Sequence, residues 1–225
     1  MPLLAEDLFL LLLDERTGKP IVDGAKLPRV LAGAVLLELA LVGVATPADK
    51  GESVRKGRLV LRQDVQPDDR ILSRGVEIVG GGRPMKPERA IEKISKGIRD
   101  VVAARAVADG WVREEHGRVL RVFPTLSWPQ ADGGRVRQLF GEIEAAVVED
   151  VMPTSRTAAI VSLLSAVDAA PKLFPTASRR DVKARAKQIA EGEWAGKAVR
   201  KAVEAVNGAV IAGVTTAPIV TGTSN

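Results

Sequence analysis

The sequence predicts a mainly α-helical protein, folded as a single globular domain around one buried apolar helix. Residues 27–44 are apolar on nearly every side of a helix, which is typical of a helix enclosed by others. This stretch is too short and too charged, with Arg29 and Glu38, to span a bilayer, which needs about 20 apolar residues. Hydrophobic residues make up 46% of the 225 residues, enough for a core of mostly aliphatic side chains.

The other elements follow in chain order. The buried helix is expected at residues 28–41, because Pro28 suits a first helical turn and Gly43 suits the position after the last one. A strand at 57–62 is expected to pair with 42–44 across a turn-rich stretch. Further helices are predicted at 3–13, 67–79, 132–150, 154–169, 178–191 and 194–213.

Residues 87–109 are predicted to form one long amphipathic helix that ends at Asp109-Gly110. Its apolar face carries Ile91, Ile94, Ile98 and Val101, with Arg105 on the same line. Its other side carries Arg89, Lys93, Lys96 and Arg99, at intervals of three or four residues. Like charges at this spacing repel. Two interpretations remain open: a solvated face, or a surface that binds an anionic ligand.

A β-hairpin is predicted at residues 111–123, with its turn at 114–117. Bulky Trp111 and Phe123 accompany three cations, Arg113, Arg118 and Arg121. Apolar side chains flanked by arginines suit an anionic membrane surface or a protein partner. The alternative is a hairpin packed on its own core with exposed arginines.

Composition excludes several kinds of site. The chain has no cysteine and one histidine, His116, so disulfides, thiolate metal sites and histidine-based catalysis are not expected. No metal site and no cofactor are predicted. The net charge of +5 favours acidic partners. Glu38 lies among aliphatic residues and needs a partner if it is buried. We expect Glu38 to form a structural pair rather than to act as a catalytic acid. Trp128 and Trp194 are expected to be packing anchors.

The order of these features resembles the Golgi phosphoprotein family, in particular its prokaryotic branch. The resemblance rests on the runs at 8–14 and 36–41, on Lys86-Pro87-Glu88-Arg89, and on the helix and hairpin that follow. It implies a helical peripheral membrane adaptor that reads phosphatidylinositol 4-phosphate. It also implies that Lys96 and Arg99 stand at two headgroup-binding positions of the family. The family's tryptophan falls near Asp23 and a third headgroup arginine falls on Ala32; Arg29, nearly one turn earlier, is expected to substitute for that arginine.

We therefore predict a non-enzymatic, cytoplasmic protein that associates peripherally with membranes. Its predicted ligand is an anionic lipid, either phosphatidylinositol 4-phosphate or another phosphorylated headgroup, held by Arg29, Lys96 and Arg99. The hairpin is expected to contact the membrane or a second copy, and a membrane-protein cargo is a further expected partner. The domain is expected to span 1–215, with 216–225 as a disordered tail. The alternative is a winged-helix-like nucleic-acid-binding protein, since a helix followed by a hairpin occurs twice and the charge is basic.

Overall fold

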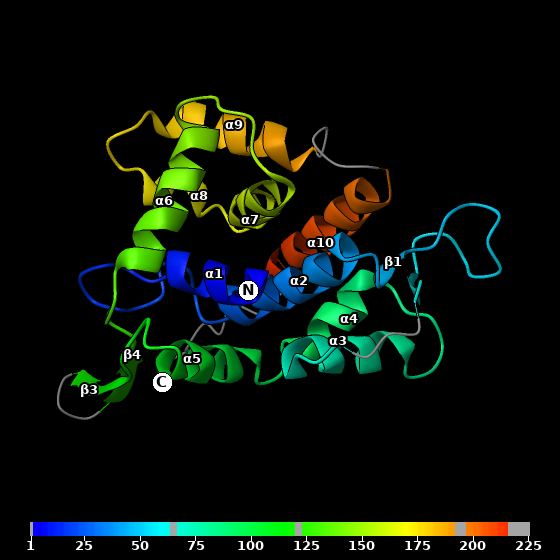
Figure 1. The fold of residues 1–225 in the computed structure, drawn as a ribbon, viewed down its shortest axis with the longest axis horizontal. Helices are drawn as coiled ribbons and strands as arrows, with labels where there is room; N and C mark the ends of the chain where they lie inside the picture. The colour runs from blue at the N-terminus through cyan, green and yellow to red at the C-terminus, as the bar shows by residue number, and fades with distance from the viewer. Residues whose placement is uncertain (1, 64–66, 120–122, 192–196, 216–225) are drawn as a thin grey trace, which may run out of the picture.

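Three helices form the middle of the molecule: α1 (Leu4–Leu11), α2 (Lys26–Leu41) and α10 (Lys197–Thr215). The computed structural model describes residues 2–63, 67–119, 123–191 and 197–215. In Figure 1 the central helices lie between two outer groups. One group contains α3 (Arg70–Gly80), α4 (Pro87–Ile94) and α5 (Ile98–Ala108). The other contains α6 (Gly134–Val147), α7 (Ser155–Ala166), α8 (Ala170–Leu173) and α9 (Arg179–Ala190).

The buried central helix predicted from the sequence is confirmed as α2. Every residue of α2 from Val30 to Ala40 is buried, including Glu38. Gly33 lies where α2 crosses α10 and α7, and a β-carbon there would come within 3.0 Å of Val210 and 3.1 Å of Leu163. The absent side chain therefore allows the three helices to approach closely. The buried side chains form one continuous core, so the prediction of a single, mainly helical domain is confirmed.

Most of the other helices predicted along the chain are also confirmed. Within the described residues, no helix end of α1, α2, α3, α6, α7 or α9 differs from its prediction by more than three residues. The short helix α8 was not predicted. Residues 194–196 of the last predicted helix and the predicted tail at 216–225 lie outside the described residues.

Two antiparallel strand pairs complete the described structure. The first joins β1 (Ala45–Pro47) to β2 (Leu59–Leu61). The strand that pairs with β2 was expected at residues 42–44, but this strand, β1, begins at Ala45. The reason is that Val44 and Gly43 still close the end of α2, where the Val44 N–H donates to the Leu39 carbonyl at 2.8 Å.

The long helix predicted at 87–109 is wrong, because the chain breaks it into α4 and α5. Residues 95–97 form a turn in which Gly97 has φ of 76°, a left-handed conformation that ends the first helix. The break rotates α5 relative to the predicted register. Val101, expected in the apolar face, is 44% exposed, and Val102 is buried in its place. The four cations from Arg89 to Arg99 consequently do not form one helical stripe.

The second strand pair joins β3 (Glu115–Val119) to β4 (Phe123–Ser127). The predicted boundaries are wrong here, because the expected turn at 114–117 runs into β3, and the hairpin, which was expected to end at Phe123, continues through β4 to Ser127. The ladder pairs Glu115 with Ser127 and Val119 with Phe123, so the predicted turn residues 115–117 lie within a strand; residues 120–122 lie outside the described residues. Val112 and Gln130 form an isolated bridge that closes the base of this hairpin.

Candidate functional site

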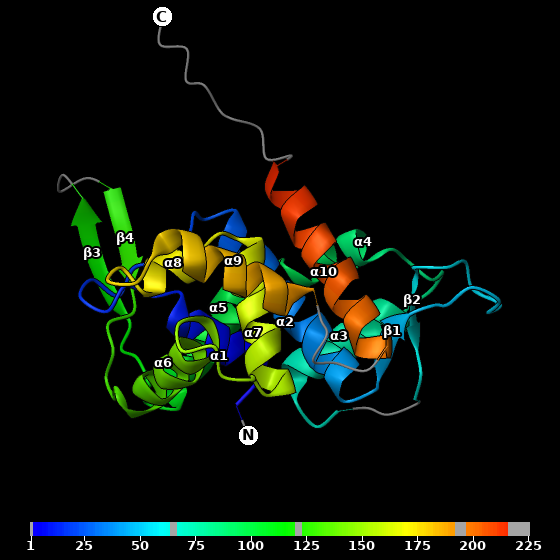
Figure 2. The same ribbon diagram turned by 90° about the horizontal axis from the view of Figure 1, so that it is seen from above.

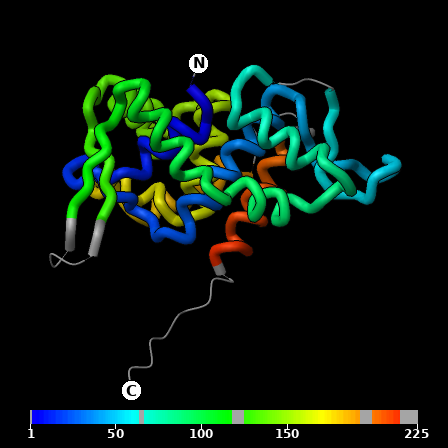
Figure 3. Tube along the Cα trace, turned by 90° about the horizontal axis from the view of Figure 1, so that it is seen from below, coloured from blue at the N-terminus to red at the C-terminus, as the bar shows by residue number. Residues whose placement is uncertain are grey.

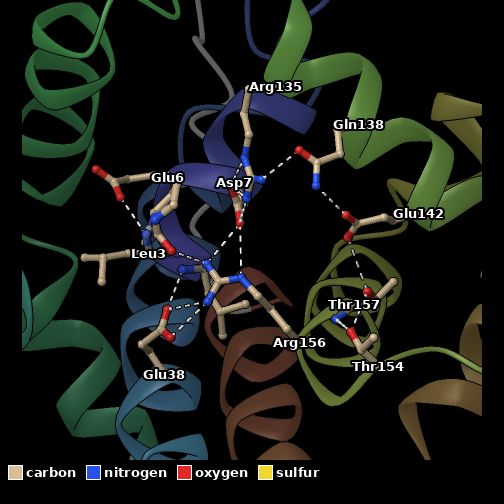
Figure 4. A network of polar contacts seen from close by, with 12 residues as sticks. Leu3, Glu6, Asp7, Glu38, Arg135, Gln138, Glu142, Thr154, Arg156 and Thr157 are labelled. Atoms are coloured by element: carbon tan, nitrogen blue, oxygen red, sulfur yellow. Dashed lines mark hydrogen bonds and ion pairs between the residues drawn. The ribbon is translucent and has the colours of Figure 1, made fainter.

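A network of buried ion pairs joins the N-terminal helix to three other helices (Figure 4). Arg156, at the start of α7, contacts two carboxylates: its Nη2 lies 2.9 Å from Asp7 Oδ2 and its Nη1 lies 3.1 Å from Glu38 Oε1. Arg135 from α6 holds the other side of Asp7, with Nη2 2.6 Å from Oδ1. Asp7 has no exposed surface, so two guanidinium groups surround one fully buried carboxylate.

Glu38 is therefore a structural residue, as expected. Besides Arg156, it accepts a hydrogen bond of 2.5 Å from the backbone N–H of Leu4, where α1 begins. Glu6, one residue before Asp7, has a separate partner: its Oε1 lies 2.7 Å from Arg105 Nε of α5. These ion pairs cross the centre of the fold and connect α1 to α2, α5, α6 and α7, although Glu6 Oε1 accepts no hydrogen bond.

Arg99 lies in the first turn of α5, against the base of the hairpin. Its guanidinium carbon is 6.0 Å from the ring centroid of Trp128, the residue that follows β4. Trp128 is 2% exposed and packs edge-on against Phe9 at 5.4 Å, so it is the packing anchor that was predicted. Arg99 also pairs with Asp100 at 2.8 Å, yet its side chain remains 45% exposed. It can therefore meet an anion from solvent while one face rests on the indole.

Lys96 occupies the turn between α4 and α5 and is exposed. The Lys96 carbonyl accepts a hydrogen bond of 3.0 Å from Arg74 Nη2 of α3, which fixes the backbone of this turn. Lys96 and Arg99 thus flank the helix break at Gly97.

Arg29 lies on α2 beside the end of α10. A β-carbon at Gly213 would come within 2.8 Å of Arg29 Cδ, so the arginine stem lies flat against the last turns of α10. Arg29 lines a pocket of about 320 Å³ with Glu88, Glu92 and Gly213. Neither Lys96 nor Arg99 lines that pocket, so the use of the three cations as one site stays a prediction.

The predicted contact residues of the hairpin lie at different distances from its base. Trp111 lies at the base, half-buried and packed against the core, rather than at a tip. Arg113 is exposed, and its backbone N–H donates to the Pro129 carbonyl at 2.9 Å, which reinforces the base. Arg118 lies in β3 and Phe123 in β4, next to the turn. Arg121 lies outside the described residues.

Comparison with known families decides what kind of protein this is. The Golgi phosphoprotein 3 (GPP34) family matches residues 4–206, which is nearly the whole chain. The chain belongs to this family. No curated protein matches the chain.

Membership of the Golgi phosphoprotein 3 family supports a non-enzymatic adaptor. Across the part of the chain that the structure describes, no helix is long and apolar enough to cross a membrane. The same residues contain no cluster of three or more histidine, cysteine, aspartate or glutamate side chains suited to a metal ion.

Sequence reasoning missed most of the ion-pair network of this family member. It identified Glu38 but not Glu6, Asp7 or their arginine partners. The signal was available, because Glu6-Asp7 directly precedes the apolar run at 8–13, within the helix predicted at 3–13. Acidic residues in a helix buried on all sides require cationic partners elsewhere in the chain.

Proposed function

We propose that this protein is a peripheral membrane adaptor that binds anionic lipid headgroups, phosphatidylinositol 4-phosphate or another phosphorylated headgroup, through Arg29, Lys96 and Arg99. The hairpin provides a second contact, with the membrane or with another copy of the protein. A membrane-protein cargo and a cytoplasmic location at the membrane surface belong to the same proposal. Its support is the family match together with the placement of these residues.

The observation that carries the proposal is the position of Arg99 over Trp128, at the base of the hairpin. The basic residues and the hairpin were predicted separately as membrane contacts. In the fold Arg99 adjoins the base of the hairpin through the buried indole of Trp128, so a headgroup at Arg99 would lie beside the hairpin. Two weak contacts on one rigid body reinforce each other through effective concentration.

The direction of the hairpin agrees with this arrangement. Figures 2 and 3 show β3–β4 and the C-terminal end of α10 extending toward the same side of the molecule. Arg29 rests against Gly213 in the last turns of α10. This arrangement supports the proposal that Arg29 and the hairpin contact one membrane surface.

A nucleic-acid-binding function receives less support from the fold. In the first of the two helix–hairpin pairs, the helix is α2, which is buried from Val30 to Ala40 and has no face free for a DNA groove there. In the second pair, the predicted helix is interrupted at Gly97. Duplex DNA is kept as an arm of the test below.

The test is co-sedimentation with phosphatidylcholine vesicles that contain phosphatidylinositol 4-phosphate or phosphatidylserine. Lys96→Glu with Arg99→Glu should weaken binding at least about 30-fold, because each basic residue near an anionic surface contributes about 1 kcal/mol. Arg180→Glu with Lys187→Glu is the matched control: both residues are exposed on α9, in the outer group of helices opposite α4 and α5, and the charge change is the same.

Undiminished binding by the Lys96/Arg99 variant would overturn the site assignment. Tighter binding of the parent to duplex DNA than to anionic vesicles, at matched salt, would favour the nucleic-acid alternative. Binding limited to phosphatidylinositol 4-phosphate vesicles would identify the headgroup.

A further inference from the structure

A second, more strongly cationic groove runs along α4 and shares Glu88 and Glu92 with the pocket that Arg29 lines. It is formed by the chain just before β2, the connection from α3 to α4, and α4 itself, and has a volume of about 1090 Å³. Two carboxylates, Glu88 and Glu92, line it together with five cations. The cations are Arg58, Arg83, Lys86, Arg89 and Lys93.

Most of these cations have no acidic partner. Arg83, Lys86, Arg89 and Lys93 form no ion pair with any described carboxylate within 4.0 Å, although Glu88 and Glu92 line the same groove. The local excess of positive charge is therefore not neutralised by the described part of the protein. A multiply charged anion would neutralise it.

The charges of α4 are separated rather than alternated. Arg89 and Lys93 are four residues apart, and so are Glu88 and Glu92. Each is a like-charge pair on a helix surface, which destabilises by a few tenths of a kcal/mol, whereas alternating signs at this spacing stabilise. Arg89 and Glu92, three residues apart, partly offset this cost, and all four side chains line the groove, where the cations of the neighbouring segments leave positive charge in excess. A ligand-binding role explains this pattern better than a solvated face.

The walls of the groove are held together by hydrogen bonds before any ligand arrives. The Leu59 N–H donates to the Met85 carbonyl at 2.8 Å, which ties β2 to the connection before α4. Arg58 Nη1 donates to the Pro84 carbonyl at 2.5 Å, so this guanidinium is fixed at one wall. Met85 is 6% exposed and anchors the connection in the core. A groove that is already formed loses less conformational entropy on binding.

We infer that this groove is an anion-binding site for a ligand that carries several phosphate charges. One phosphate group would occupy a small part of the volume and contact only some of the five cations. The ligand is a phosphorylated lipid headgroup or a free polyphosphorylated molecule, which share this chemistry. The site is separate from Lys96 and Arg99, neither of which lines the groove. It stands whether or not the proposed function does.

Isothermal titration with inorganic tripolyphosphate tests the site directly. The parent protein should bind it with an affinity that falls as salt is raised, because exposed charges are screened beyond about 8 Å at physiological ionic strength. Arg89→Glu with Lys93→Glu should weaken binding about 100-fold, because each of the two charge-assisted hydrogen bonds to phosphate contributes about tenfold. The Lys96/Arg99 and Arg180/Lys187 double variants should retain parental affinity.

Vesicles distinguish the two sources of the ligand. If Arg89→Glu with Lys93→Glu also loses binding to vesicles that contain phosphatidylinositol 4-phosphate, the groove takes a lipid headgroup. If only tripolyphosphate binding is lost, it takes a soluble ligand. Loss of vesicle binding in the Lys96/Arg99 variant alone leaves both proposals intact, since it reports on a different site.

Three results would overturn the inference: no binding of tripolyphosphate by the parent, equal binding by the groove variant, or an equal loss in the Arg180/Lys187 control. Thermal melting of the groove variant is the folding control. Charge reversal keeps a like-charge pair at positions 89 and 93 but turns the opposite-charge pair Arg89–Glu92 into a like-charge pair, at a cost of a few tenths of a kcal/mol, so the melting temperature should fall only slightly. If the helical variant misfolds, Arg83→Glu carries the same test, because Arg83 is exposed in the connection and lies outside the helices.

Discussion

Replacing Arg156 by methionine should destabilise the fold strongly, because Arg156 serves two buried acids at once. The substitution removes the ion pairs to Asp7 and Glu38 and a hydrogen bond to the Pro2 carbonyl. Asp7 keeps Arg135, but Glu38 keeps only the backbone N–H of Leu4 among its described partners. The side chain of Glu38 is 11% exposed, so little water can replace the missing guanidinium.

The expected magnitude follows from the partners that remain. Removing one partner of a buried ion pair costs about 3–5 kcal/mol. The low end applies here, because the Arg156 side chain is 20% exposed and Asp7 retains a second arginine. A decrease of about 3 kcal/mol in the free energy of unfolding should lower the melting temperature by about 6–12 °C in a chain of this size.

Urea and thermal unfolding followed by circular dichroism would measure this decrease. Arg135→Met is the matched control: its side chain is similarly exposed, at 19%, but Asp7 is the one described carboxylate that loses a partner, and Asp7 keeps Arg156; the other loss is a hydrogen bond of 3.4 Å to Gln138 Oε1. It should cost less than Arg156→Met.

The decisive comparison places Arg156→Met in a background that already carries Asp7→Asn and Glu38→Gln. With both acids neutral, removal of the arginine no longer strands a buried charge, so its cost should fall to near zero. An equal cost in both backgrounds would refute the reasoning and show that Arg156 acts through packing alone.

Three other predictions follow from particular positions. Gly97→Ala should lower the free energy of unfolding by about 1 kcal/mol, because Gly97 has a positive φ and a β-carbon there has no other atom within 4 Å. The control, Gly24→Ala, lies at an equally open position without a positive φ and should be neutral. Equal effects of the two substitutions in chemical denaturation would contradict the role assigned to the turn at Gly97. Burial raises the pKa of Glu6 above 4.5, although the Leu3 N–H and Arg105 partly offset it. The stability that this carboxyl contributes is thus complete below its unfolded pKa and is lost as pH rises through its folded pKa. In melting curves, the difference in melting temperature between the parent and Glu6→Gln should therefore fall as pH rises between these two pKa values. A difference that grows with pH would contradict the raised pKa. Deletion of residues 116–126, with Glu115 and Ser127 joined by Asn-Gly, should leave a folded protein, because Val112 and Gln130 still close the base. It should weaken vesicle binding and shift any oligomer toward monomer in light scattering, whereas unchanged affinity and mass would assign the hairpin a purely structural role.

The sequence by itself determined the helical class, the central position of α2 and the need of Glu38 for a partner. These depend on the order of apolar and polar residues along a few helical turns, which any reader of the chain can count. Helix ends were predictable for the same reason, since prolines, glycines and polar caps act on their immediate neighbours.

Tertiary structure alone decided which residues meet. The partner of Glu38 is Arg156, 118 positions away, and nothing local to either residue names the other. The helix break at Gly97 and the turn of the hairpin were also missed, because the amphipathic pattern continues through Gly97 and the strand signals extend past the predicted turn. The cationic groove combines Arg58, next to β2, with Arg89 and Lys93 of α4. Its charge arises only when packing brings these segments together, because periodicity along a chain describes which face of an element is buried and not which distant element covers it.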